Sequence, residues 1–332
     1  MERIAVVGAG SWGTTVACLA GRGHPTVLWA RRRSVADEIN ETGRNTQYLP
    51  DLTLPESLSA TSDLAEAASG ASAVVMAVPS HGFRDVFEQV ASELDRETPV
   101  VSLTKGIEQG TLATMTQVIT DVAPDHDPGR IGVLTGPNLA SEIAAGQPTA
   151  SVMAMADIDA ATRLQSVFMS PSFRVYTNDD VTGCELGGAL KNVMAIAAGM
   201  SDGLGYGDNT RATLITRSLA ELTRLGIALG GQPSTFAGLA GMGDLIATCI
   251  STSSRNHRVG FRLAQGQTLD EIVTEMSMVA EGVKTTRAVL DLAGRNLIDM
   301  PIATHVGRVL YENMHPREAV MSLMTRDAKP ED

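Results

Sequence analysis

The chain has 332 residues, a formal net charge of −12, 43% hydrophobic residues and only 4% aromatic residues. This length and apolar content suit a globular protein of about two domains, while the acidic balance and scarce aromatic side chains argue against nucleic-acid binding. No apolar run approaches the roughly 20 residues that span a bilayer and no secretory signal precedes the first apolar run, so we expect a cytoplasmic protein without a membrane segment.

The N-terminal apolar stretch, Ile4–Val7, predicts a strand that runs directly into Gly8-Ala9-Gly10-Ser11-Trp12-Gly13, and a helix-like stretch follows. In such a turn Gly8 permits a tight bend, Gly10 lets a pyrophosphate approach the backbone, and Gly13 lets the helix pack closely on the strand. The N–H groups at the helix start attract the anion. The order of strand, glycine turn and helix therefore predicts dinucleotide binding.

Short apolar runs then alternate with amphipathic helical stretches over the first half of the chain. This rhythm predicts a mostly parallel sheet with helices on both faces. The further strands are expected at Thr26–Trp29, Ala73–Val78, Val100–Leu103, Ile131–Leu134, Ser151–Ala154 and Phe173–Tyr176.

After about residue 178 long helical patterns replace the strands. The predicted fold class is therefore α/β, with a Rossmann-like, mostly parallel sheet domain over residues 1–178 followed by an all-helical domain over residues 179–332. The expected helices of the second domain are Gly183–Met200, Asn209–Leu229, Arg255–Ala264, Leu269–Met276, Gly282–Ala293 and Ile302–Tyr311.

The end of the second strand bears on which nicotinamide cofactor is bound. An NAD-selective fold places Asp or Glu there to hold the ribose 2′-hydroxyl. Here Arg31, Arg32 and Arg33 follow the strand, and the next carboxylate is Asp37. Arginine pairs with a 2′-phosphate that a carboxylate would repel, so we favour NADPH over NADH. The alternative is three solvated arginines at a helix start.

Two lysines are candidates for catalysis. Lys105 follows an apolar strand at its C-terminal end, where ligands bind in open α/β sheets. Lys191 stands in an almost wholly apolar helix, which predicts burial. Burial and a neighbouring ammonium both lower a lysine's pKa, and a neutral amine is a competent general base. The alternatives are a surface Lys105 and a Lys191 that extends to solvent.

A third polar cluster comprises Gly241–Thr248 and Ser251–Arg258. Ser253 or Ser254 suits a helix N-cap, which would put Arg255 and Asn256 in the first turn beside exposed N–H groups. This arrangement predicts a phosphate site, although a capped surface helix would have the same sequence. The histidines and the three cysteines lack metal-ligand spacing, so we expect no metal.

These motifs together resemble the bacterial NAD(P)-dependent sn-glycerol-3-phosphate dehydrogenases, and the resemblance runs nearly from end to end. It extends from Val7–Thr14 to Met300-Pro301-Ile302. The most specific stretches are Thr104-Lys105-Gly106, Gly136-Pro137 with Ala140 and Glu142, Ser172–Tyr176, Glu185–Val193, Gly241–Leu245 and Ser254-Arg255-Asn256.

The resemblance implies a function, partners and residue roles. It implies reversible reduction of dihydroxyacetone phosphate by a cytoplasmic homodimer that supplies glycerophospholipid synthesis. Catalytic roles fall to Lys191 as proton acceptor, with Lys105 and Asp244. The implied substrate contacts are Lys105, Gly136, Asn138, Lys191, Asn192, Asp244, Thr248, Ser254, Arg255 and Asn256, and the implied dinucleotide contacts are Gly8, Gly10, Ser11, Trp12, Gly13, Arg31, Arg32, Lys105, Ala140, Arg255, Val279 and Glu281.

Asn138 departs from the family pattern, in which Thr or Ser is frequent, but it keeps a short polar side chain. Two other functions remain open from the residues alone. A β-hydroxyacid dehydrogenase has the same two-domain layout and a helical lysine, yet it needs a carboxylate anchor in place of Ser254-Arg255-Asn256. A dinucleotide-sensing regulator would bind cofactor without turnover, and a buried lysine is a costly feature for such a protein.

Overall fold

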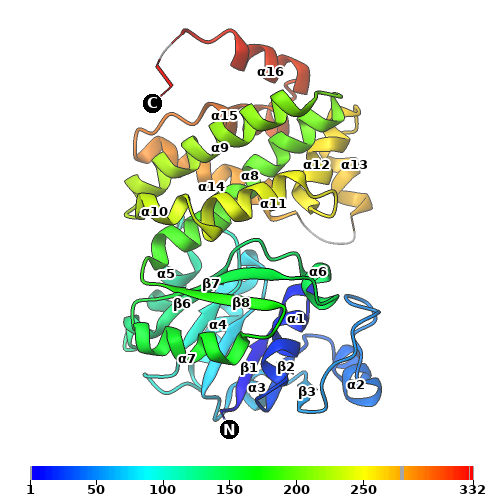
Figure 1. Cartoon of the computed structure of the whole chain (residues 1–332), viewed down its shortest axis with the longest axis vertical. Coiled ribbons are helices and arrows are strands. Elements are labelled where there is room, and N and C mark those ends of the chain that lie inside the picture. The colour runs from blue at the N-terminus through cyan, green and yellow to red at the C-terminus, as the bar shows by residue number, and fades with distance from the viewer. Residues whose placement is uncertain (1, 277–279, 329, 332) are drawn as a thin grey trace. The chain divides into compact units, whose positions relative to one another are not determined.

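The computed structural model describes residues 2–276, 280–328 and 330–331. The chain divides into two compact units, Met1–Glu185 and Leu186–Asp332, whose elements are labelled in Figure 1. The division falls within one continuous helix, α8 (Val181–Gly203), just after the last strand of the sheet ends at Asn178.

The N-terminal unit is built on one eight-stranded sheet with strand order β3-β2-β1-β4-β5-β6-β7-β8. The order of the first six strands is the usual one of dinucleotide-binding sheets, and it reverses direction between β1 and β4. All pairs are parallel except β6 with β7. The strands are β1 Ile4–Val7, β2 Thr26–Trp29, β3 Leu58–Thr61, β4 Ala73–Met76, β5 Val100–Ser102, β6 Ile131–Thr135, β7 Thr149–Met155 and β8 Phe173–Asn178.

Helices cover both faces of this sheet because its strands alternate their buried side chains between two cores. Ile4 and Val6 of β1 join the core formed with α1, α2 and α7, whereas Ala5 and Val7 join the core formed with α3, α4 and α5. The helices of the unit are α1 Ser11–Gly21, α2 Arg33–Thr42, α3 Leu64–Ala68, α4 Phe83–Ala91, α5 Met115–Val122, α6 Ala140–Ala144 and α7 Ile158–Phe168, with short 3₁₀ turns at Ser80–Gly82 and Pro128–Arg130.

The C-terminal unit is helical throughout its described residues, as expected (Figure 1). The six predicted helices are present within a few residues, and α10, α11 and α16 were not predicted. The helices that follow α8 are α9 Asp208–Ala228, α10 Pro233–Phe236, α11 Asp244–Ile250, α12 Arg255–Ala264, α13 Leu269–Glu275, α14 Glu281–Arg295, α15 Pro301–Tyr311 and α16 Pro316–Met324, with a π-helical turn, η3, at Leu239–Gly243.

The fold class is therefore the predicted one, with one strand more than expected, β3. Among the described residues no single helix is long and apolar enough to cross a membrane, and one bent pair, Pro233–Ile250 with Arg255–Ala264, meets the criteria of length and composition alone.

Candidate active site

The glycine turn after β1 has the backbone geometry that a bound pyrophosphate requires. Gly8 has φ +126°, a conformation that side chains rarely adopt. A Cβ on Gly13 would lie 1.9 Å from the Gly8 carbonyl oxygen, so the helix packs directly against the turn. A Cβ on Gly10 would meet nothing within 4 Å, and Gly10 is the N-cap of α1, whose first turn has no acidic residue. The turn thus leaves open space beside a positive helix end.

Two neighbours of the turn belong to the predicted dinucleotide contacts. The Trp12 ring packs edge-on against Phe173, with ring centroids 6.3 Å apart. Its indole N–H is buried without a hydrogen-bond partner in the described part of the chain, and such a group is expected to find one when a ligand binds. Ala140 begins α6 beside α1, because the Thr15 hydroxyl lies 3.4 Å from the Ala140 carbonyl oxygen. Ser11 lies at the start of α1.

The end of β2 carries arginines and no carboxylate. Arg31 and Arg32 are exposed at the start of α2, and Arg32 donates to the side chain of Gln47. Arg33 has a loose ion pair with Asp37, 3.9 Å between Nε and Oδ2. Both cations predicted to bind a 2′-phosphate are therefore at the surface beside the second strand.

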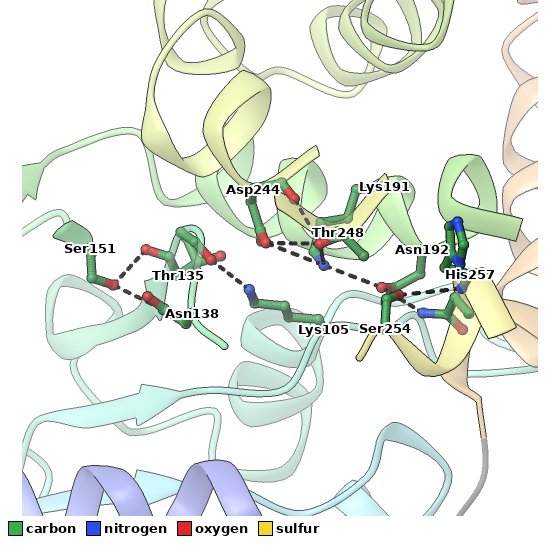
Figure 2. Close-up of polar contacts among 12 residues, drawn as sticks. Lys105, Thr135, Asn138, Ser151, Lys191, Asn192, Asp244, Thr248, Ser254 and His257 are labelled. Atoms are coloured by element: carbon green, nitrogen blue, oxygen red, sulfur yellow. Dashed lines mark hydrogen bonds and ion pairs between the residues drawn. The ribbon is translucent and has the colours of Figure 1, made fainter. Parts of the chain in front are cut away.

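The C-terminal ends of β5 and β6 bring three predicted substrate contacts together. The Lys105 ammonium donates to the carbonyl oxygen of Gly136 at 2.9 Å (Figure 2). Gly136 has φ +138°, and a Cβ there would lie 3.2 Å from the Cα of Ser151. Asn138 donates to the Ser151 hydroxyl at 3.0 Å, and its own side-chain oxygen is buried without a partner in the described residues. This edge thus presents one ammonium and one unsatisfied amide oxygen.

In the C-terminal unit, Lys191 is the centre of a buried polar cluster (Figure 2). Its side chain is 5% exposed, and its ammonium forms an ion pair with Asp244, 3.2 Å between Nζ and Oδ1. It also donates to the Thr248 hydroxyl at 2.6 Å and lies 3.4 Å from the side-chain oxygen of Asn192. Thr248 in turn donates to the Asp244 carbonyl oxygen at 2.7 Å. Three predicted residues, Asp244, Thr248 and Asn192, therefore surround one amine.

This cluster places Asp244 where the catalytic role implied by the family resemblance needs it. Its carboxylate lies against the Lys191 amine, and the Thr248 hydroxyl accepts from the same amine. Hydrogen bonds therefore fix the direction in which the amine points.

The cluster continues into the first turn of α12. Asn256 donates to the side-chain oxygen of Asn192 at 2.9 Å, and it accepts from the backbone N–H of Gly282 at 2.9 Å. Ser254 is the N-cap of α12, as predicted, and accepts from the backbone N–H of His257. The N-terminus of α12 therefore lies beside the residue that follows Lys191 on α8. No acidic residue occupies the first turn of α12, which suits an anion.

Three more predicted residues are Arg255, Glu281 and Val279. Arg255 is exposed at the first position of α12, and the carboxylate of Glu281 attracts its guanidinium. Glu281 begins α14. Val279 lies outside the described residues.

Two features of this unit were missed by the sequence analysis. The buried imidazole of His257 lies 2.9 Å from the carboxylate of Asp202, and Arg211 forms an ion pair with the same carboxylate at 3.0 Å. An isolated histidine gave no signal in the sequence; its only indication was its place directly after Arg255 and Asn256.

No group of three or more His, Cys, Asp or Glu side chains within the described ranges is arranged to hold a metal ion. The three cysteines, Cys18, Cys184 and Cys249, are buried and unbridged. Burial raises the pKa of Cys249 to about 12, so its thiol stays protonated.

Comparison with known proteins places these features in a family. Residues 3–161 match the NAD-dependent glycerol-3-phosphate dehydrogenase N-terminus and residues 180–321 match the C-terminus of the same family. The chain belongs to the NAD-dependent glycerol-3-phosphate dehydrogenases. The two matches together span both units, and the interval between them ends at the start of α8.

Relatives of this family match along nearly the whole chain. A glycerol-3-phosphate dehydrogenase [NAD(P)+] 2 of Sphingopyxis alaskensis is 56% identical over 92% of this chain and 90% of its own length. A glycerol-3-phosphate dehydrogenase [NAD(P)+] of Lysinibacillus sphaericus is 49% identical over 100% of this chain and 98% of its own. The crystal structure of glycerol-3-phosphate dehydrogenase from Coxiella burnetii has a TM-score of 0.92 at 38% identity, covering 98% of this chain and 99% of that one.

Proposed function

We propose that this chain reduces dihydroxyacetone phosphate reversibly to sn-glycerol 3-phosphate, with NADPH favoured over NADH, and that Lys191 is its proton donor. The observation that carries the proposal is the buried Lys191 ammonium, paired with Asp244 and adjoining a capped helix N-terminus. The relatives, which are named glycerol-3-phosphate dehydrogenase [NAD(P)+], support the same reaction.

The proton reaches the substrate oxygen from Lys191. In the direction of reduction, the ammonium donates to the carbonyl oxygen as that oxygen becomes an alcohol; in oxidation, the amine takes the proton back. Thr248 and Asp244 fix the direction of the amine through hydrogen bonds, and Asp244 balances its charge. Asn192 supplies a further oxygen beside the amine.

The substrate phosphate binds at the N-terminus of α12. First-turn N–H groups and the helix dipole favour an anion there, and Arg255 adds a positive charge. Asn256 and Ser254 hold this turn in place through their own hydrogen bonds. Because the phosphate is tethered, the reacting carbonyl is oriented, and such positioning contributes at most about 7–11 kcal/mol to lowering the barrier.

The dinucleotide belongs to the N-terminal unit. The open space at Gly10, the close turn at Gly8 and Gly13, and the unsatisfied Trp12 N–H fit its pyrophosphate and neighbouring groups. A reduced nicotinamide, when bound, supplies the hydride. The remaining dinucleotide contacts are assigned to Ser11, Arg31, Arg32, Lys105, Ala140, Arg255, Val279 and Glu281, with the arginine pair reading the 2′-phosphate.

Lys105, Gly136 and Asn138 are assigned to the substrate as well. Lys105 adds positive charge that stabilises the developing alkoxide, and the unsatisfied Asn138 oxygen accepts from a substrate hydroxyl. We also propose a domain boundary at residues 178–179, a cytoplasmic homodimer and a role in supplying glycerol 3-phosphate for phospholipid synthesis.

One assay tests the core of this proposal. The purified chain is mixed with dihydroxyacetone phosphate and either NADPH or NADH, and the absorbance of the reduced nicotinamide is followed. We expect turnover with both cofactors and a higher kcat/KM with NADPH. Cofactor binding without turnover would favour the sensing protein, and turnover only with an unphosphorylated β-hydroxyacid would favour the other dehydrogenase class.

A further inference from the structure

Helices α8 and α12 touch through their backbones at three glycines. A Cβ on Gly199 of α8 would lie 1.9 Å from the His257 carbonyl oxygen, and a Cβ on Gly260 of α12 would lie 1.9 Å from the Ile196 carbonyl oxygen. A Cβ on Gly203 would lie 2.7 Å from the Phe261 carbonyl oxygen. Even alanine at these positions would push the helices apart. The helix that carries Lys191 and the helix that begins at Arg255 are therefore in direct backbone contact.

A chain of side-chain hydrogen bonds, which runs from a buried imidazole to the surface, fastens the same two helices. His257, on α12, is 3% exposed, and its Nε2 lies 2.9 Å from Oδ2 of Asp202, on α8. The other oxygen of Asp202 accepts from Arg211 of α9, at 3.0 Å from Nη2 and 3.3 Å from Nε. Arg211 is held in turn by Asp208, at 2.8 Å. Both oxygens of the Asp202 carboxylate therefore form hydrogen bonds, and Arg211 holds the carboxylate in place against His257.

These contacts anchor the first turn of α12 at two points on α8. Asn256 is bonded to Asn192, and His257 to Asp202, and the two partners on α8 are separated by about 15 Å of helix. Two hydrogen bonds at adjacent residues fix the position of this helix end along α8 and also its rotation. A single hydrogen bond would leave the helix end free to rotate. The N–H groups of this turn are the proposed phosphate ligands, so their placement relative to Lys191 depends on both anchors.

We infer that His257 and Asp202 are positioning residues for substrate phosphate: they hold the N-terminus of α12 at a set place on α8 without touching substrate themselves. The inference rests on the proposed function, because it assumes that the phosphate binds at this helix end. If the second anchor is lost, the turn can rotate about Asn256, and a phosphate bound there is held less well. The proton donor, fixed by Asp244 and Thr248, is unaffected.

The experiment compares His257→Leu with the unaltered chain on two substrates, dihydroxyacetone phosphate and unphosphorylated dihydroxyacetone. For the phosphorylated substrate, we expect KM to rise about tenfold with kcat within about threefold, because a charge-assisted contact behind the binding turn is lost. For dihydroxyacetone, kcat/KM should stay within about twofold. His257→Gln, whose amide N–H can reach the same carboxylate, should restore most of the KM.

A matched control is His305→Leu. His305 is also a buried histidine of the C-terminal unit, and its two ring nitrogens bond to Pro301 of α15 and Ser322 of α16 rather than to α8 or α12. It should leave both KM values unchanged, and a rise like that of His257→Leu would overturn the inference. An equal loss on both substrates in His257→Leu, or no rescue by His257→Gln, would overturn it too.

Asp202→Ala keeps the test available should His257→Leu fail to fold, because it removes the partner of the imidazole on α8 and leaves α12 unaltered. It should raise the KM for the phosphorylated substrate selectively, and an unchanged KM would contradict a positioning role for the contact between His257 and Asp202. These outcomes are distinct from failure of the proposed function, since that would remove turnover of dihydroxyacetone phosphate by the unaltered chain as well.

Discussion

Replacement of Lys191 by methionine should lower both the catalytic rate and the free energy of unfolding, and the two effects can be measured separately. The substitution removes the ammonium that lies 3.2 Å from Asp244 and leaves that carboxylate, 2% exposed, without its opposite charge. Breaking a buried pair in this way typically destabilises by about 3–5 kcal/mol. At about 2–4 °C per kcal/mol, Tm should fall by about 6–20 °C.

The double variant Lys191→Met/Asp244→Leu distinguishes the lost catalyst from the damaged fold. With both charges replaced by apolar groups of similar size, the desolvation penalty disappears, and Tm should return most of the way to that of the unaltered chain. Thr248 keeps its bond to the backbone carbonyl of residue 244. The rate of dihydroxyacetone phosphate reduction should nevertheless stay about 10²–10⁴-fold below normal, because no proton donor is restored.

Thermal unfolding followed by circular dichroism, with steady-state rates measured well below the transition, supplies both quantities. The reasoning about the pair is refuted if the double variant is as unstable as the sum of the two single variants, since that would mean the charges do not interact. The reasoning about catalysis is refuted if Lys191→Met retains a kcat within about tenfold of normal.

Three further predictions follow from the described contacts. With NADPH at saturation, so that a weakened cofactor contact does not limit the rate, Arg255→Ala should raise KM for dihydroxyacetone phosphate by about tenfold or more and leave kcat/KM for unphosphorylated dihydroxyacetone unchanged. Equal losses on both substrates would show that Arg255 does not bind the phosphate. Replacing Arg31 and Arg32 by alanine should lower kcat/KM for NADPH but not NADH, and an unchanged ratio of the two would show that they do not bind the 2′-phosphate. Burial raises the pKa of Glu221 from 4.5 to about 7, although its carboxylate accepts from two backbone N–H groups of α15. Between these two pH values the folded state holds a proton that the unfolded state has lost, so the free energy of unfolding should fall by about 3 kcal/mol as pH rises from 4.5 to 7. Urea unfolding at several pH values should show this slope, and Glu221→Gln should flatten it.

The glycine turn and the buried lysine of α8 could be predicted because each follows from a local pattern. Gly8, Gly10 and Gly13 follow an apolar strand directly, and Lys191 interrupts an apolar helix. The glycines are required by backbone sterics, and the burial of the lysine follows from the apolar residues around it in the same helix. Both effects arise within one element, so the sequence alone reveals them. The N-cap at Ser254 is of the same kind.

Other features depend on distant partners and could not be predicted. Strand β3, Leu58–Thr61, has small residues and only two buried side chains, Leu58 and Ala60, so its pattern is too short to distinguish from a loop. Strand β7 runs antiparallel to its neighbour β6, and no pattern within the residues of β7 indicates this direction. The pairing of Lys191 with Asp244 joins two helices far apart in the sequence, so only the family resemblance, and no local pattern, pointed to it.

The glycine contacts between α8 and α12 bear on substrate selection. Because backbone meets backbone with no rotatable side chain between them, the spacing from the anion-binding turn to the lysine has little freedom to adapt. A phosphate ester with one more carbon between its phosphate and its carbonyl would therefore bring the oxygen to the wrong place even while its phosphate is bound. The chain would thus select among ketone phosphates by the distance between phosphate and carbonyl, and the glycines between α8 and α12 would set the distance that is accepted.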